Sequence, residues 1–274
     1  MRGKGGRGHG QFRANQALGQ HFLSDPVLLD DLVTLSGIGP EDTVFEIGPG
    51  LGSLTEALAA RARAVLALEV DPRLLPILAV RLHGQHNVQV VEGDVMTANL
   101  PELLGPLGPF HVVANLPYYL TTPILNLLLT LPLPVKSINV MVQKEAAERI
   151  VAVPSTPAYG PLAVLAQYRA QPTVVRLIEA REFSPPPKTD SAFVTMPIRD
   201  VPPVAVPDEA LFFRLVSAAF QMRRKTLLNN LMPAFGLSRE QAAAALKQAG
   251  LPDNVRGEAL SLQAFAALAQ VLSA

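Results

Sequence analysis

The sequence predicts an α/β fold: a parallel β-sheet with helices on both faces, followed by a small all-α C-terminal domain. Short apolar segments with the composition of strands alternate with segments of helical periodicity over residues 43–152. A Pro-rich segment at 199–207 interrupts the chain, and only helical patterns follow it. The length, 274 residues, suits one large domain with a smaller one appended.

The N-terminal half begins with a Gly- and Arg-rich stretch, residues 1–16, which we interpret as a basic disordered arm. Asp25 and Pro26 form an N-cap and first-turn pair, which predicts a helix over 27–35. Strands and helices then alternate, and the right-handed crossover rule sets their handedness. The predicted strands are 43–50, 64–71, 88–94, 110–118 and 137–143, and the predicted helices are 53–62, 72–82, 122–131 and 144–152.

The C-terminal part begins beyond a late strand predicted at 191–198. We place the domain boundary in the Pro-rich break, so that a domain of residues 17–202 precedes a helical domain of residues 203–274. The helical patterns of this second domain cover 208–220, 224–232, 238–250 and 261–272.

Composition excludes several classes of protein. The chain has no cysteine, which removes disulfides, thiolate nucleophiles and Cys-ligated zinc, and no other metal site is expected. No apolar run reaches the ~18 residues of a membrane span, and the N-terminus lacks the apolar region of a secretory signal. We therefore expect a cytoplasmic protein that does not enter a membrane.

Charge is distributed unevenly although the net charge is zero. Residues 1–20 hold four basic and no acidic residues, residues 21–200 hold 12 basic and 18 acidic, and residues 201–274 hold seven basic and five acidic. This pattern suits a cationic small ligand inside the body and a polyanion at the ends. The alternative from charge alone is that the basic ends only keep the protein soluble.

A glycine-rich turn follows the first long strand, at Glu46-Ile47-Gly48-Pro49-Gly50-Leu51-Gly52. Glycines at such a turn let backbone N–H groups approach a ligand closely. The match to a dinucleotide fingerprint is imperfect, because the third glycine is replaced by Ser53 and Pro49 stiffens the turn. Taken alone, this motif indicates either a ligand loop or a tight turn.

Carboxylates end the next two strands. Glu69 follows the glycines by about twenty residues, the position from which a carboxylate reaches ribose hydroxyls, whereas Asp71 resembles an N-cap for the next helix. Asp94 ends the third strand, where it can accept a hydrogen bond from an adenine amine. The alternative is that the first two carboxylates only cap the chain. Together, the three strand ends predict a nucleoside pocket without a diphosphate site.

The fourth strand ends in Asn115-Leu116-Pro117-Tyr118. Asn115 offers a carbonyl acceptor, Pro117 holds Leu116 extended so that its C=O can face the pocket, and Tyr118 supplies a flat ring. These groups suit a planar base that is held by its exocyclic amine and stacked on its face. The alternative is a structural turn with Tyr118 in the core.

These motifs resemble the S-adenosylmethionine-dependent rRNA adenine N6,N6-dimethyltransferases over about residues 17–262. The stretches that carry the resemblance, in order, are "GQHFLSDP", "FEIGPGLGSLTEALA", "LEVD", "EGDVM", "VVANLPYYLTTPIL", "MVQKEAAERI", "PAYGPLAVLAQY", "FSPPPKTDSAFV" and "AFQMRRKTLLNNL". The chain is most similar to the KsgA (RsmA) branch, which dimethylates two adjacent adenines in a hairpin near the 3′ end of 16S rRNA. The macrolide-resistance methyltransferases of 23S rRNA share part of the pattern and are the alternative.

The resemblance implies a Rossmann-like class I methyltransferase sheet, S-adenosylmethionine as cofactor and S-adenosylhomocysteine as product. It implies a monomer that acts on 16S rRNA in the small subunit or its precursor. The cofactor contacts it implies are His21, Leu23, Gly48, Gly50, Glu69, Asp94, Val95 and Asn115. His21 stands where the family often has Asn. Tyr119 also stands where many members have Asn, and we expect Tyr119 to alter the pocket floor.

Catalysis is assigned by the same resemblance to Asn115, Leu116, Pro117 and Tyr118, with Phe183 as a second stacking ring. A basic step predicted at a helix start, Arg223-Arg224-Lys225, is expected with Lys188 to contact RNA phosphates. Its alternative is a solvated helix face. Two rival functions also stay open: a nicotinamide-dependent oxidoreductase, and a ribosome-assembly or transcription factor that has kept the fold but lost catalysis.

Overall fold

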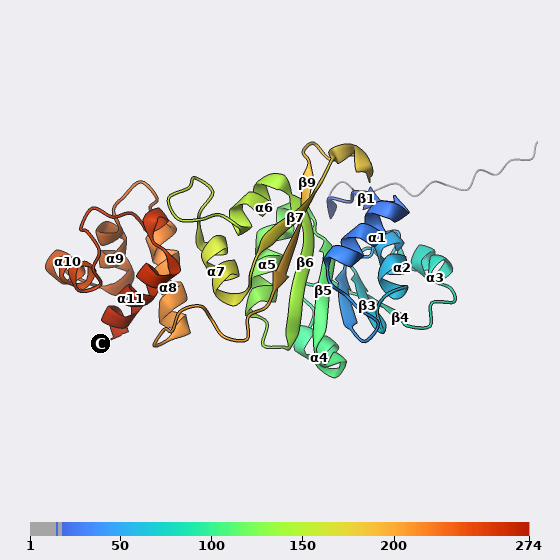
Figure 1. The fold of residues 1–274 in the computed structure, drawn as a ribbon, viewed down its shortest axis with the longest axis horizontal. Helices are drawn as coiled ribbons and strands as arrows, with labels where there is room; N and C mark the ends of the chain where they lie inside the picture. Colours follow the sequence, from blue (N-terminus) through green and yellow to red (C-terminus); the bar gives the residue numbers. More distant parts are fainter. Residues whose placement is uncertain (1–14, 16–17, 274) are drawn as a thin grey trace, which may run out of the picture.

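The computed structural model describes residue 15 and residues 18–273. The predicted basic arm, residues 1–16, therefore lies outside the described residues apart from Asn15. The described part is elongated, with a sheet domain at one end and a bundle of helices at the other (Figure 1). In this part of the chain, no helix combines the length and the apolar character that crossing a membrane requires.

The main sheet has seven strands in the order β4-β3-β2-β5-β6-β9-β7. The first five are parallel to their neighbours, so their carboxyl ends share one edge. Their bounds are Val88–Glu92 (β4), Ala64–Glu69 (β3), Thr43–Ile47 (β2), Phe110–Asn115 (β5) and Val135–Gln143 (β6). The predicted alternation of strands and helices is thereby confirmed for this part of the sheet.

The last two strands of the sheet depart from an all-parallel arrangement. Strand β9 (Ser191–Pro197) pairs antiparallel with β6 and also with β7 (Thr173–Ile178), which forms the edge. Strand β7 was not among the strands predicted from the sequence, although Thr173, Val174 and Val175 have the β-branched side chains typical of a strand. A separate pair of two-residue strands, β1 (Phe22–Leu23) and β8 (Phe183–Ser184), is too short to leave a pattern.

Helices cover both faces of the sheet. On one face, α1 (Pro26–Leu35) and α2 (Ser53–Ala59) contribute Val33 and Leu58 to a core with Val44 and Val65. On the other face, α5 (Thr121–Thr130) packs against β5 and β6. The remaining helices of this domain are α3 (Leu75–Arg81), α4 (Leu100–Leu104), α6 (Lys144–Ile150) and α7 (Pro161–Arg169). Helix α3 begins three residues later than predicted.

Four helices form the C-terminal part: α8 (Glu209–Gln221), α9 (Leu227–Phe235), α10 (Arg239–Gln248) and α11 (Leu262–Ser273). They follow the irregular segment 199–207, where we predicted the domain boundary. Their core is not separate, because Tyr159, Val164 and Tyr168 from the sheet domain belong to the same buried cluster as Phe212 and Phe265. The basic step 223–225 lies in the turn before α9, not at a helix start as predicted.

Candidate active site

A pocket opens at the carboxyl edge of the parallel strands, where β2, β3 and β5 end and the segment 18–23 crosses them. This is the edge at which ligands bind in open α/β sheets. Six of the predicted cofactor residues line the pocket, as does Pro117; the six are His21, Leu23, Gly48, Gly50, Glu69 and Asn115. Residues far apart in sequence are thus brought together as the motifs predicted.

The glycine turn after β2 forms the floor of this pocket. Gly48, Gly50 and Gly52 have left-handed φ values of 68°, 60° and 85°, a region that favours glycine. At Gly50 a β-carbon would also come within 2.9 Å of the Phe22 ring. The turn therefore needs glycine at residue 50 for its backbone conformation and for the close approach of β1.

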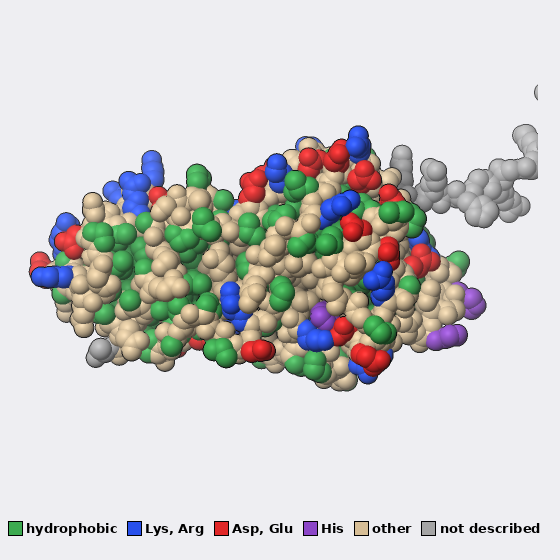
Figure 2. Space-filling view, viewed as in Figure 1, with side chains coloured by type: hydrophobic (Ala, Val, Ile, Leu, Met, Phe, Trp, Pro, Cys, Tyr) green, Lys and Arg blue, Asp and Glu red, His purple; other side chains and the backbone are tan. Residues whose placement is uncertain are grey.

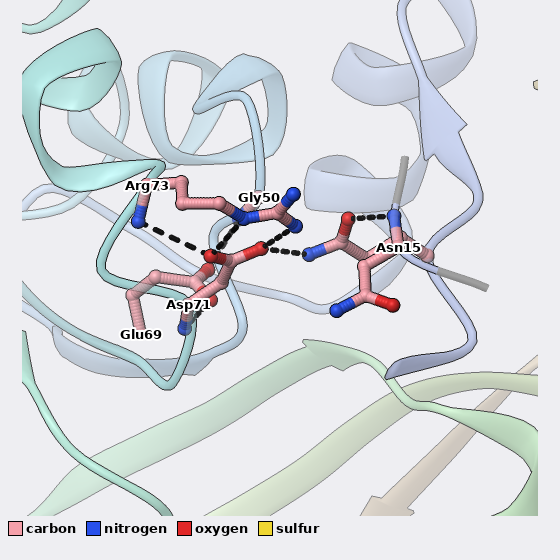
Figure 3. A network of polar contacts seen from close by, with 6 residues as sticks. Asn15, Gly50, Glu69, Asp71 and Arg73 are labelled. Carbon is pink, nitrogen blue, oxygen red and sulfur yellow. Dashed lines mark hydrogen bonds and ion pairs between the residues drawn. The ribbon is translucent and has the colours of Figure 1, made fainter. Parts of the chain in front are cut away.

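Glu69 holds the glycine turn in place. Its Oε2 accepts a hydrogen bond of 3.0 Å from the Gly50 N–H, and its Oε1 accepts one of 2.8 Å from the Asp71 N–H (Figure 3). The side chain is buried, and burial raises its pKa, an effect that the two backbone N–H groups oppose. A carboxylate oxygen can accept more than one hydrogen bond, so this geometry leaves Glu69 able to bind a hydroxyl as well.

Asp71 anchors the N-terminal segment instead of only capping a helix. Its carboxylate accepts hydrogen bonds from Arg73 Nε at 2.8 Å and from Gln20 Nε2 at 2.9 Å (Figure 3). The hydrogen bonds from Arg73, the largest cause, lower the pKa of Asp71 to about 2. The segment that crosses the pocket is therefore tied to the end of β3 by a carboxylate that stays charged at neutral pH.

A second set of contacts fixes the same segment from the other side. His21 Nδ1 donates a 2.7 Å hydrogen bond to the Pro185 carbonyl, and the His21 ring stacks on Tyr118 with centroids 5.7 Å apart. Strand β1 also pairs with β8, which places Leu23 opposite Phe183. These contacts close the pocket along the side that faces β5.

Asn115 ends β5 at the pocket wall. Its Nδ2 donates a 2.8 Å hydrogen bond to the His21 carbonyl. Because a carbonyl can only accept, this bond fixes which end of the amide is NH₂, so Oδ1 is presented as an acceptor. The next residue, Leu116, is buried and donates its N–H to the Met141 carbonyl at 3.0 Å.

Tyr118 and Tyr119 lie beyond the pocket wall in the short helix η3 (Tyr118–Leu120). The Tyr118 hydroxyl is 2.8 Å from Ser191 Oγ, and burial raises the pKa of this phenol. Tyr119 is 57% exposed and does not line the pocket, so our expectation that it alters the pocket floor is wrong. Its ring lies near the Gly19 backbone, at the rim.

Phe183, Asp94 and Val95, like Leu116, lie outside the pocket lining. Phe183 is 3% exposed and packs in a core cluster with Leu23 and Met141, behind the wall. Asp94 accepts a 2.9 Å hydrogen bond from the Met96 N–H, and Val95 is buried beside β4. The roles assigned to these three residues stay predictions.

Glu46 is a pocket residue for which the sequence motifs predicted no role. It lines the pocket from the end of β2 and is 1% exposed. Neither of its carboxyl oxygens has a hydrogen-bond partner among the described residues, and its pKa is raised to about 8, with burial the largest cause. A charged residue in an otherwise buried strand was the signal that could have found it.

The four residues predicted to contact RNA, Lys188, Arg223, Arg224 and Lys225, are all exposed. Arg223 also donates a 2.9 Å hydrogen bond to the Pro157 carbonyl, and its guanidinium is 3.7 Å from the Glu258 carboxylate. In the space-filling view, Lys and Arg side chains gather at the edge of the C-terminal helices (Figure 2).

Within residue 15 and residues 18–273, no group of three or more His, Asp or Glu side chains is placed to hold a metal ion. The polar groups of the pocket are amide, carboxyl and backbone N–H groups around a narrow apolar wall. Such a lining suits a small molecule that carries both polar and apolar parts.

Comparison with known proteins agrees with this geometry. A family model described as "Ribosomal RNA adenine dimethylase" matches residues 11–273. The chain is 46% identical over 271 residues to a "Ribosomal RNA small subunit methyltransferase A" from Streptococcus pneumoniae, covering 96% of this chain and 93% of that protein. A protein of the same name from Geobacillus thermodenitrificans is 44% identical over 268 residues, covering 95% and 92%.

Two solved structures resemble the fold over most of its length. A dimethyladenosine transferase from Plasmodium falciparum has a TM-score of 0.77 and 25% identity, covering 90% of this chain and 96% of that one. The 23S rRNA methyltransferase ErmE has a TM-score of 0.71 and 28% identity, covering 92% and 100%.

Proposed function

Because the chain belongs to the ribosomal RNA adenine dimethylase family, we propose that it transfers methyl groups from S-adenosylmethionine to N6 of two adjacent adenines in 16S rRNA. The observation that carries this proposal is the fixed amide of Asn115, whose Nδ2 is bound by the His21 carbonyl beside the glycine turn. An oriented acceptor next to a nucleoside pocket is what methylation of an exocyclic amine requires.

The pocket residues fit the cofactor. At Gly48 a β-carbon would meet no atom within 4 Å, so the turn leaves open space there, Glu69 can accept hydrogen bonds from ribose hydroxyls, and Leu23 supplies an apolar wall. When bound, the cofactor supplies a sulfonium methyl group that a nucleophile can displace. Asp94 and Val95, which follow β4 outside the pocket lining, would hold the adenine end of the cofactor.

Asn115 and Leu116 would orient the target nitrogen. The lone pair of adenine N6 is delocalised into the ring, which makes it a poor nucleophile. Hydrogen bonds from N6–H to Asn115 Oδ1 and to the Leu116 carbonyl favour a more tetrahedral nitrogen, whose lone pair can then be directed at the methyl group. Tyr118, with Pro117 fixing its approach, supplies a stacking face for the flipped base, and Phe183 would be a second face.

The RNA would be held by phosphate contacts away from this pocket. Exposed Lys188, Arg224 and Lys225 offer cations for the backbone. Relatives named for the small subunit are 44–46% identical to this chain, whereas the 23S rRNA enzyme is 28% identical. The small-subunit substrate is therefore favoured over 23S rRNA, and we expect the protein to act as a monomer.

Replacing Asn115 by Ala tests the proposed chemistry. Losing an orienting group lowers the rate of methyl transfer by about 10²–10³-fold. The variant should therefore form very little N6-dimethyladenosine while still binding immature small subunits. Asn126→Ala, at an exposed position on α5, is the matched control and should methylate normally. Mass spectrometry of 16S rRNA gives the readout. Methylation at the wild-type rate by the Asn115 variant would contradict the role of Asn115. If the wild-type protein itself forms no N6-dimethyladenosine, a non-catalytic assembly factor would be favoured.

A further inference from the structure

Glu46 is a carboxylic acid that the fold buries at the pocket wall without a partner. It is the penultimate residue of β2, 1% exposed, and it lines the same pocket as Gly50 and Glu69. Both carboxyl oxygens, and the Thr55 hydroxyl on α2, lack a hydrogen-bond partner in the described part of the chain. An unpaired polar group in a native structure calls for an explanation, such as a ligand that completes it.

The surroundings of Glu46 keep it uncharged. Burial, the largest cause, raises the pKa of Glu46 to about 8, and the Glu69 charge on β3 adds to this rise. Other neighbours on the pocket wall are Asn115 on β5 and Leu29 on α1, which carry no charge, and His21, which is titratable. The described residues that line this pocket include no Lys or Arg, so an ionised Glu46 would lack a fixed counter-ion.

On the basis of the proposed function, we propose that Glu46 receives the positive charge of S-adenosylmethionine, and that it releases its proton to solvent when the cofactor binds. The cofactor carries a sulfonium and an ammonium group against one carboxylate, a net charge of plus one. A cation brought next to a buried acid favours the ionised form of that acid. The proton leaves for the buffer, and the pair of opposite charges remains in the pocket.

Isothermal titration calorimetry of the full chain measures this proton directly. Binding heats at pH 6.5 in buffers of different ionisation enthalpy report the protons released. At this pH the ligand's α-amino group, ordinarily with a pKa of about 7.7–8.0, stays charged. We expect the wild type to release close to one proton per cofactor bound, because a group with a pKa of about 8 is almost fully protonated there.

Two controls isolate Glu46 from other titrating groups. Glu46→Gln keeps the size of a neutral acid but has no proton to lose, so release should fall by close to one proton, while any change at His21 or Glu69 stays the same in both proteins. The neutral nucleoside 5′-methylthioadenosine lacks the sulfonium and ammonium groups, so it should bind both proteins without this release.

Affinity gives a second readout. As the pH rises from 5.5 to 7, the affinity of the wild type for S-adenosylmethionine should increase by up to about tenfold per pH unit more than the affinity of Glu46→Gln does. Equal proton release by wild type and Glu46→Gln, or no release by the wild type, would overturn the inference. Neither result concerns methylation by the wild type, so mass spectrometry of 16S rRNA from the wild type shows separately whether the proposed function holds. The wild-type titration needs no variant, which keeps the test valid even if Glu46→Gln folds poorly.

Discussion

Glu69 combines two tasks in one side chain. Its carboxylate accepts hydrogen bonds from the Gly50 and Asp71 N–H groups, and the same group is our proposed ribose contact. A residue with both tasks should matter for cofactor binding through the shape of the turn as well as through direct contact.

Replacing Glu69 by Ala should weaken cofactor binding by about 1–3 kcal/mol, the cost of losing hydrogen bonds to a charged group. Calorimetric titration with S-adenosylmethionine measures the effect. Glu56→Ala is the matched control, because Glu56 lies outside the pocket lining and pairs with Arg81 on the protein surface. Unchanged affinity in the Glu69 variant would remove it from the binding site.

His111 is a buried titratable residue at the opposite end of the sheet, remote from the pocket. Its Nδ1 is 2.7 Å from Ser137 Oγ, and its Nε2 is 3.3 Å from the Asp42 carboxylate. Burial, the largest cause, lowers the pKa of His111, and the Asp42 charge opposes that effect. A hydrogen bond from Lys136 lowers the pKa of Asp42 to about 2, so this carboxylate is charged near neutral pH.

The lowered pKa of His111 predicts a loss of stability in acid. Below the unfolded value of about 6.5, the unfolded chain binds a proton that the folded protein resists, at about 1.4 kcal/mol per unit of pKa difference. His111→Gln should therefore show a smaller fall in the free energy of unfolding between pH 7 and pH 5 than the wild type. Urea unfolding at both pH values is the measurement; parallel behaviour of the two proteins would contradict the prediction. The raised pKa of Glu46 has the opposite effect on the free energy of unfolding, but this effect is the same in the wild type and in His111→Gln.

At the level of elements, the connection between α6 and α7 joins the two parts of the molecule. Ser155 donates its N–H to the Glu258 carbonyl at 2.7 Å, and the Tyr159 hydroxyl donates to the Leu260 carbonyl at 2.9 Å. Arg223 binds the same connection through the Pro157 carbonyl. This connection and the turn around 257 therefore fix where the helices sit against the sheet.

Arg223→Ala should lower the free energy of unfolding by about 1 kcal/mol, the usual net value of a hydrogen bond. Its neighbour Arg224 is exposed, and Arg224→Ala is the matched control with an expected change near zero. Thermal unfolding of the two variants gives the comparison. Equal melting temperatures would show that Arg223 does not stabilise the junction.

Gly257 marks a close approach within the helical part, between the turn around 257 and α8. A β-carbon at residue 257 would lie 2.3 Å from the Ala219 carbonyl oxygen of α8, and that oxygen belongs to the backbone. Gly257→Ala should therefore cost more than the about 1–3 kcal/mol of ordinary overpacking. Gly105→Ala is the control, because a β-carbon there meets no atom within 4 Å. Urea unfolding that ranks the two variants equally would contradict this account of the contact between residue 257 and α8.

At the scale of the whole molecule, the pocket and our proposed RNA contacts lie in different parts of the chain. The pocket lies in the sheet domain, whereas Arg224 and Lys225 project from the turn before α9 in the helical part. The two parts share one core through Tyr159 and Tyr168, so a substrate bound to the helices is held at a fixed position relative to the pocket.

Replacing Arg224 and Lys225 together by Ala should weaken RNA binding and reduce its salt dependence by up to about two phosphate contacts. Cofactor affinity should not change, because neither residue lines the pocket. Binding of a 16S rRNA fragment at several salt concentrations measures the slope. A slope equal to that of the wild type would mean that these residues form only a solvated surface.

The sequence by itself determined the parallel half of the sheet and the edge where the pocket lies. Periodicity and glycine placement are local properties, and parallel strands put their carboxyl ends on one edge, so Gly50, Glu69 and Asn115 could be brought together without a structure. The all-helical character of the C-terminal part also followed from local signals, the helical periodicity that begins after the Pro-rich segment 199–207.

Only the tertiary structure decided which groups meet across long sequence separations. The pairing of β9 between β6 and β7, the hydrogen bond from Asn115 to the His21 carbonyl, the burial of Phe183 and the isolation of Glu46 all depend on such contacts. A local pattern reports whether a residue faces the interior, but not which atoms it finds there. Whether a polar side chain has a hydrogen-bond partner depends on which distant segments pack against it, and that is set by the packing of the whole chain.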